Sequence, residues 1–116
     1  MKENIIQQKS FNFALLIIEL YKKLIKRNEF VLSKQILRSG TSIGANIEES
    51  IGAQSKNDFI SKISISYKEA RETEYWLKLL LGGKYITEEE FKVYTEEIIT
   101  ILKLLTAIQR TSKQNR

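Results

Sequence analysis

The sequence predicts an all-α protein folded as an up-down-up-down antiparallel four-helix bundle. The 116 residues include no proline and 28% charged residues, which favours long uninterrupted helices. Apolar residues recur at three- and four-residue spacing through four segments, which is typical of amphipathic helices. Short links between the segments place consecutive helices antiparallel. We expect a single domain over residues 1–116, with a frayed tail at 112–116.

The first helix, expected from about Asn4 to Arg27, has more apolar surface than a core needs. Besides its core stripe it carries a second one, which lies nearly opposite at about 100° per residue. A helix that is apolar on both sides exposes a large patch in a monomeric bundle, and such patches usually mark interfaces. The alternative is that loops and the N-terminal segment cover the stripe. The second stripe consists of Phe11, Leu15, Ile18 and Ile25.

The second helix, expected from about Val31 to Ala53, contains an unusual stretch of small residues around Gly40 and Gly44. Their propensity for helix is poor, but the two glycines lie one turn apart on nearly the same side. We favour a close approach of a neighbouring helix over a kink, a loop or a ligand cradle. A phosphate loop is disfavoured because the GxxxxGK[ST] pattern is absent.

The third helix is expected from about Asn57 to Leu81, with Ser55 or Asn57 as its N-cap, and Gly82-Gly83 is expected to end it. It also carries apolar residues turned away from its core stripe. We expect these residues to join the second stripe of the first helix in contacts between subunits of a homo-oligomer. They are Ile65, Trp76 and Leu79.

The fourth helix, expected from Glu88 to Thr111, begins with the clearest local signal in the chain. Thr87 can accept from the backbone N–H of Glu90, and the Glu90 carboxylate can reach back, which makes a capping box. Glutamates in the first turn also favour the positive end of the helix dipole.

The antiparallel hairpin of the second and third helices brings Arg38 to the level of several glutamates. We expect a structural ion network of Arg38 with one or more of Glu69, Glu72 and Glu74, because arginine can bind a carboxylate through two parallel hydrogen bonds. The alternative is a hard-cation site. Its candidate ligands would be Glu48, Glu49, Glu69, Glu72 and Glu74.

The net charge of +5 permits an acidic partner, and the predicted topology gathers basic residues at one end of the bundle. A ring of subunits would repeat such a patch, and phosphate backbones bind repeated patches in a salt-dependent way. The alternative is a solvated basic surface that only maintains solubility. The candidate nucleic-acid-binding residues are Lys2, Lys9, Lys56, Lys62, Arg110, Lys113 and Arg116.

The absence of cysteine and histidine excludes many kinds of chemistry. Thiol nucleophiles, thiolate zinc sites, histidine bases and histidine metal ligands are all missing, so only a carboxylate-bound metal could support catalysis. We expect no catalytic residue, cofactor or metal. With no signal-peptide pattern and no long apolar run, we expect a cytoplasmic protein without a membrane partner.

Two stretches resemble the signatures of a known family: Ile36–Glu49 (ILRSGTSIGANIEE) and Lys68–Leu77 (KEARETEYWL), with Phe59 and Lys62 in the turns before the second. The family is that of the bacterial four-helix-bundle proteins encoded in intervening sequences of 23S ribosomal RNA genes. It is related to the accessory variability determinant of diversity-generating retroelements, which binds nucleic acid and a reverse transcriptase. The resemblance implies a homopentameric ring and a structural role for Arg38 and its glutamates.

Three functions therefore compete. The first is a non-enzymatic homo-oligomer that binds RNA or DNA through its basic surface. The second is an adaptor whose partner is a protein, for example a reverse transcriptase or a ribosome-associated factor. The third is a carboxylate–metal enzyme, which we disfavour because ferritin-like metal bundles require histidine in their motifs.

Overall fold

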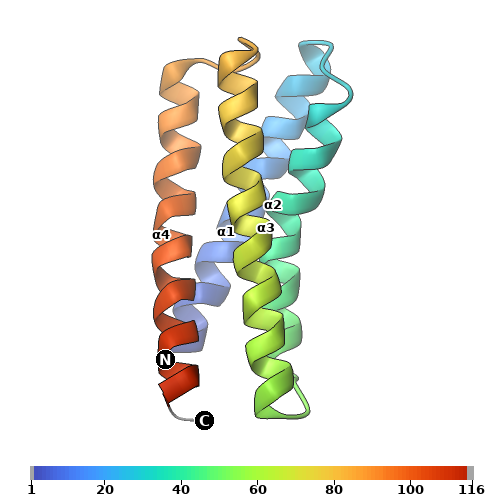
Figure 1. The fold of residues 1–116 in the computed structure, drawn as a ribbon. Helices are drawn as coiled ribbons and strands as arrows, with labels where there is room; N and C mark the ends of the chain where they lie inside the picture. The colour runs from blue at the N-terminus through green and yellow to red at the C-terminus, as the bar shows by residue number, and fades with distance from the viewer. Residues whose placement is uncertain (1, 115–116) are drawn as a thin grey trace.

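A computed structural model of the chain describes the backbone of residues 2–114 and the side chains of residues 5–114. It confirms the predicted fold class: four helices run alternately up and down and form an elongated bundle of 46 × 21 × 20 Å (Figure 1). The start of the first helix, the second turn and the end of the last helix gather at one end, which we call the terminal end. The helices are α1 (Lys2–Lys26), α2 (Leu32–Ile51), α3 (Lys56–Gly82) and α4 (Glu88–Gln114).

Each helix packs against two neighbours. Over the part of the chain that the structure describes, α1 contacts α2 and α4, α3 contacts the same two helices, and α1 does not contact α3. The helices α1 and α3 therefore lie at diagonal corners on either side of α2, and their outward faces point to different sides of the bundle. The apolar stripes meet in one continuous core, which includes the fully buried side chains of Phe13, Ile17, Ile43, Leu77 and Ile98.

The helix starts are fixed by local side-chain caps. Ser55 is the N-cap of α3, where its hydroxyl accepts from the backbone N–H of Asp58 at 3.0 Å. The predicted capping box is confirmed: Thr87 Oγ1 accepts from Glu90 N at 3.1 Å, and the Glu90 carboxylate accepts from Thr87 N at 2.9 Å. These bonds satisfy N–H groups that have no partner within the helix.

The helix α3 ends at Gly82 with Gly83 as its C-cap, where the two glycines were predicted to end it, but neither glycine is the left-handed residue. The left-handed residue after this helix is Lys84, with φ of 66°, whereas Gly83 is right-handed with φ of −80°. Tyr85 N donates to Leu80 O and Lys84 N donates to Leu81 O, which is the hydrogen-bond pattern of a Schellman motif. The glycines therefore precede the position at which the motif requires a positive φ, and a lysine occupies it instead.

The turn between α1 and α2 contains a cap that the sequence did not predict. Asn28 is left-handed, with φ of 64°, and ends α1 through the same Schellman pattern. The next residue, Glu29, is buried, and its carboxylate accepts from the backbone N–H groups of Val31 and Ser33. A carboxylate at this position also complements the positive end of the α2 dipole.

The last helix is longer than predicted. Residues 112–114 continue α4 to Gln114, so they are helical where we expected a frayed tail, and residues 115–116 lie outside the described region. No glycine or proline interrupts this segment, and the helical hydrogen bonds therefore continue. None of the helices, within the range that is described, is both long and apolar enough to cross a bilayer.

Candidate assembly and binding surfaces

The structure confirms the predicted close approach of a neighbouring helix at the small-residue stretch of α2, where α1 packs against both glycines. A Cβ atom on Gly40 would lie 2.8 Å from Cγ1 of Ile17, a fully buried residue of α1. A Cβ atom on Gly44 would lie 3.4 Å from Ser10 Oγ, which is an ordinary contact. Any side chain at Gly40 would therefore displace the buried Ile17 side chain. At Gly44 a Cβ atom would lie 3.5 Å from a backbone atom of Ser10, so the α1 backbone itself comes close there.

The other side of α2 joins α3 through buried hydroxyl groups. Thr73 Oγ1 donates to Ser39 Oγ at 2.8 Å, and Ser66 Oγ donates to the carbonyl oxygen of Ile43 at 2.9 Å. Small hydroxyl residues allow the helices to approach while their polar atoms remain hydrogen-bonded, as burial requires. Within the small-residue stretch, the hydroxyl of Ser39 therefore serves the contact with α3, whereas the hydroxyls of Thr41 and Ser42 donate to backbone carbonyls of α2 itself.

The predicted ion network lies on the outer edge of this α2–α3 contact. Arg38 Nη1 binds Glu69 Oε1 at 3.1 Å, and Arg38 Nη2 binds Glu72 Oε2. The indole Nε1 of Trp76 donates to the same Glu72 oxygen at 3.0 Å. Because the Arg38 side chain is 49% exposed, the network lies at the surface and is not an interior ion pair.

Glu74 does not belong to this network, which corrects that part of the prediction. Its carboxylate binds Nε of Arg71 at 3.4 Å, three residues earlier on α3. The signal was present in the sequence, since residues three apart are neighbours on a helix surface. Within residues 5–114 no three acidic side chains converge on a point that could hold a metal ion, and Arg38 engages both Glu69 and Glu72.

The second apolar stripe of α1 is exposed. Phe11 is 63% exposed and Leu15 48%, Ile18 is exposed as well, and Ile25 is half-buried. Neither of the neighbouring turns covers the stripe, so the alternative in which loops bury it is wrong for the described chain. The stripe is a row of large apolar side chains along the outward face of α1.

A second apolar surface lies on the outward face of α3. Ile65 and Leu79 are exposed and Trp76 is half-buried. Tyr75, which the sequence analysis did not single out, is 55% exposed, and its ring centroid lies 5.4 Å from that of Trp76. This surface adjoins the Arg38 network through Trp76 and Glu72, so apolar and charged groups alternate along it.

The terminal end gathers the described members of the basic group, but one of them is paired. Lys62 Nζ lies 2.9 Å from Glu49 Oε1, and this pair raises the pKa of Lys62. As far as the side chains are described, Lys9, Arg110 and Lys113 form no ion pair or hydrogen bond, and Lys56 is exposed. The side chain of Lys2 and the whole of Arg116 lie outside the described residues.

The opposite end contains an ion pair that the sequence analysis missed. Arg27 binds both carboxylate oxygens of Glu90, at 3.1 and 3.0 Å, and Lys23 lies 3.7 Å from the same carboxylate. The hydrogen bonds from Arg27 lower the pKa of Glu90 from 4.5 to about 2, with a further contribution from the Thr87 N–H. Arg27 also donates to the carbonyl of Tyr85, which ties α1 to the α3–α4 loop.

Comparison with known proteins agrees with the resemblance inferred from the two motifs. The model of a family described as 23S rRNA-intervening sequence protein matches residues 2–107. The chain is also similar to a crystal structure of a protein with unknown function from the S23 ribosomal protein family of Bacteroides thetaiotaomicron VPI-5482. The two are 53% identical with a TM-score of 0.93, over 95% of this chain and 99% of the other. No curated protein matches the chain.

Proposed function

The chain belongs to the 23S rRNA-intervening sequence protein family, and we propose that it is a non-enzymatic homo-oligomer, a pentameric ring, that binds RNA or other nucleic acid through its basic surface. The observation that carries the assembly is the pair of apolar surfaces on α1 and α3. Exposed apolar rows of this kind are rare on monomers and usually mark interfaces. We call them the α1 stripe (Phe11, Leu15, Ile18 and Ile25) and the α3 surface (Ile65, Tyr75, Trp76 and Leu79).

A ring of five copies needs two different complementary surfaces on each subunit, because its contacts are head to tail. The α1 stripe and the α3 surface meet this requirement, since α1 and α3 lie at diagonal corners with outward faces on different sides of the bundle. In the proposed ring the α1 stripe of one copy packs on the α3 surface of the next. A two-fold dimer would instead pair one surface with itself.

Mixing two variants distinguishes these arrangements. One variant carries Phe11→Ser and Leu15→Ser, and the other carries Ile65→Ser and Leu79→Ser; all four side chains are exposed, so the fold should survive. We expect each variant alone to be monomeric. An equimolar mixture should form a one-to-one dimer, because one intact α1 stripe still meets one intact α3 surface.

The matched control is Val93→Ser with Ile99→Ser on α4, where two exposed apolar residues lie outside both surfaces. This variant should keep the mass of the parent protein in light scattering. A mixture of the α1 and α3 variants that stays monomeric would contradict head-to-tail contact. If either surface variant keeps the full mass, that surface does not form the interface.

The nucleic-acid part of the proposal is supported by the net charge of +5 and by the free cations of the terminal end. Lys9, Arg110 and Lys113 have no described acidic partner, so their charges are available to phosphates. A five-fold ring would repeat this set around its axis. Contacts of this kind bind phosphate backbones without reading base sequence, and their affinity falls as salt rises.

Fluorescence anisotropy with labelled RNA and DNA at low and at physiological salt tests this part. We expect binding that weakens with salt and that falls about tenfold in a variant carrying Arg110→Glu and Lys113→Glu. The control is Lys92→Glu with Lys103→Glu, the same charge change elsewhere on α4, which should have a much smaller effect. Absence of binding at low salt would remove nucleic acid as the partner and leave the protein-adaptor alternative.

A further inference from the structure

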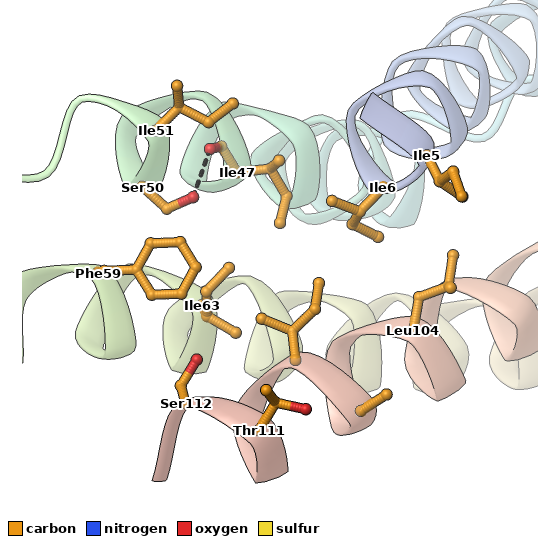
Figure 2. Close-up of a pocket in the computed structure, with 12 residues that line it drawn as sticks. Ile5, Ile6, Ile47, Ser50, Ile51, Phe59, Ile63, Leu104, Thr111 and Ser112 are labelled. Carbon is orange, nitrogen blue, oxygen red and sulfur yellow. Dashed lines mark hydrogen bonds between the residues drawn. The ribbon is translucent and has the colours of Figure 1, made fainter. Parts of the chain in front are cut away.

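A cavity opens at the terminal end of the bundle, between the α1–α2 layer and the α3–α4 layer. Its volume is about 510 Å³, which lies within the range of small-molecule sites. All four helices line it: Ile6 of α1 and Ile47 of α2 face Phe59 and Ile63 of α3, and Leu104 of α4 closes one side (Figure 2). The two layers fail to close on each other here, whereas they form a continuous core in the middle of the bundle.

The lining of this cavity suits a hydrocarbon. Most of the side chains are aliphatic, and a hydroxyl at its α2 wall is already engaged, because Ser50 Oγ donates to the carbonyl of Ile47 at 2.6 Å (Figure 2). The remaining hydroxyls belong to Thr111 and Ser112 of α4. Water inside an apolar cavity would find few hydrogen-bond partners, so such cavities stay dry and bind apolar molecules instead.

An unpaired cation of α1 lies one helical turn from the lining of the cavity. Lys9 follows Ile5 by four residues and Ile6 by three, so it lies on the face of α1 that lines the cavity, one turn further along. It is half-buried, and it has no hydrogen-bond or ion-pair partner among the described side chains. No carboxylate contributes to the lining. The site therefore combines an apolar interior with a positive charge at its edge.

We propose that this cavity binds an anionic amphiphile, a medium-chain fatty acid, with its hydrocarbon chain between the two layers and its carboxylate at Lys9. The apolar walls remove the chain from water, and the ammonium group of Lys9 offers a charge-assisted hydrogen bond to the head group. The proposal does not depend on the ring or on nucleic-acid binding. It would make the bundle responsive to a small molecule.

Isothermal titration calorimetry with decanoate, below its micelle concentration and at neutral pH, tests the proposal. We expect saturable binding of one decanoate per chain. Decyltrimethylammonium, which has the same chain and the opposite charge, should bind about tenfold more weakly because Lys9 repels it. Absence of saturable decanoate binding would overturn the proposal, and equal binding of the two amphiphiles would overturn the role of Lys9.

Two variants locate the ligand. Ala107→Phe adds a ring at a residue that lines the cavity, and it should reduce decanoate affinity about tenfold. The same change at Ala45, an exposed residue of α2 outside the lining, should leave the affinity unchanged. Lys9→Glu should reverse the preference between the two amphiphiles. Decanoate binding that is equally strong in Ala107→Phe would place the ligand elsewhere and overturn the site.

Methyl NMR of the unaltered protein provides a second readout that does not depend on the folding of a variant. Addition of decanoate should shift the isoleucine δ1-methyl signals of Ile6, Ile63 and Ile108, which line the cavity. The signals of Ile36 and Ile86, which do not line it, should stay in place. Shifts confined to isoleucines outside the cavity would overturn the assignment.

Discussion

The contacts of α2 and the contact between α1 and α4 are built in different ways. The helix α2 is held closely on both sides: Gly40 touches Ile17 of α1, and Ser39 bonds to Thr73 of α3. The α1–α4 contact is tied at the opposite end by Arg27 and Glu90, and it opens into the cavity at the terminal end. Among the helix pairs that touch, α2 and α3 share the most extensive contact and α1 and α4 the least extensive.

The difference shows which helix contacts of this sequence require a close fit between particular residues. The residues around Gly40 have poor helix propensity, so their value lies in a close fit to both neighbours. The α1–α4 contact relies on large apolar side chains and on the ion pairs of Glu90 with Arg27 and Lys23, which tolerate a gap. The signature stretch of the family therefore defines a tightly packed centre, and the less constrained contact leaves space that a ligand can use.

Among the substitutions that distinguish the α2 contacts from the α1–α4 contact, a change at Gly40 should have the largest effect on stability. Gly40→Ala places a Cβ atom 2.8 Å from the fully buried Ile17 side chain, so this core side chain or the helices around it must shift. We expect a loss of about 1–3 kcal/mol in the free energy of unfolding, measured by urea denaturation.

Gly44→Ala is the matched control for this prediction. Its Cβ atom would make only an ordinary contact at 3.4 Å, so the higher helix propensity of alanine should raise stability by up to about 1 kcal/mol. Equal effects of the two substitutions would show that the close approach at Gly40 does not determine the packing of α2. Both variants must be compared at one protein concentration, because assembly adds to apparent stability.

The ion pair that ties α1 to α4 should give the next largest effect. The pKa of Glu90 is lowered from 4.5 to about 2 in the folded protein. The charged carboxylate therefore contributes to the free energy of unfolding above a pH of about 4.5, and this contribution is lost as the pH falls toward 2. Because Arg27 is 39% exposed, solvent weakens the pair, and we expect Glu90→Gln to cost about 1–2 kcal/mol at pH 7.

The pH dependence provides the check on this pair. The difference in unfolding free energy between the parent protein and Glu90→Gln should shrink as the pH falls from about 5 to about 2. A difference that stays constant over this range would mean that Glu90 acts through its cap to Thr87 and not through its charge. Circular dichroism of urea-induced unfolding at several pH values measures both proteins.

A smaller effect is expected at the outer edge of the α2–α3 contact. Arg38→Ala removes the cation that joins Glu69 and Glu72, and it should cost about 1 kcal/mol because the network is partly exposed. Arg71→Ala, which removes a more exposed pair with Glu74 on α3 alone, should cost less than about 0.5 kcal/mol. An unchanged melting temperature for Arg38→Ala would mean that the hydroxyl contacts alone hold this edge.

The smallest expected effect is a gain in stability from a substitution in the loop before α4. Lys84 adopts a φ of 66°, which costs energy for a side chain but not for glycine. Lys84→Gly should therefore stabilise the protein by about 0.5–1 kcal/mol. Gly82→Ala, at a helical position with open space around its Cβ, should give a similar gain through helix propensity. A loss of stability in Lys84→Gly would show that the lysine side chain supports the loop.

Local patterns allowed much of the fold to be predicted. Apolar spacing located the four helices, and the spacing of three residues between Thr87 and Glu90 predicted the capping box. The absence of a side chain at Gly40 predicted the close approach of a neighbouring helix. Each of these signals is contained within a few turns of one helix. The second stripe of α1 was also visible, because Phe11 and Leu15 break the amphipathic pattern.

The features that were missed depend on how distant segments align. Arg27 and Glu90 are 63 residues apart, so their pairing follows from the register of α1 against α4. The left-handed Lys84 depends on where the backbone must reverse, which the neighbouring glycines concealed. The cavity forms where the two helix layers do not come into contact. Periodicity predicts which side chains face inward, but it does not predict the distance between side chains on opposing helices.

The central claim is that this chain assembles through two different surfaces, and its molecular mass in solution is the most direct test. Light scattering coupled to size-exclusion chromatography at micromolar concentration should give a mass near five times the 13.5 kDa of one chain. A mass equal to that of a single chain under these conditions would contradict the account, because the α1 stripe and the α3 surface would then have no partner copy.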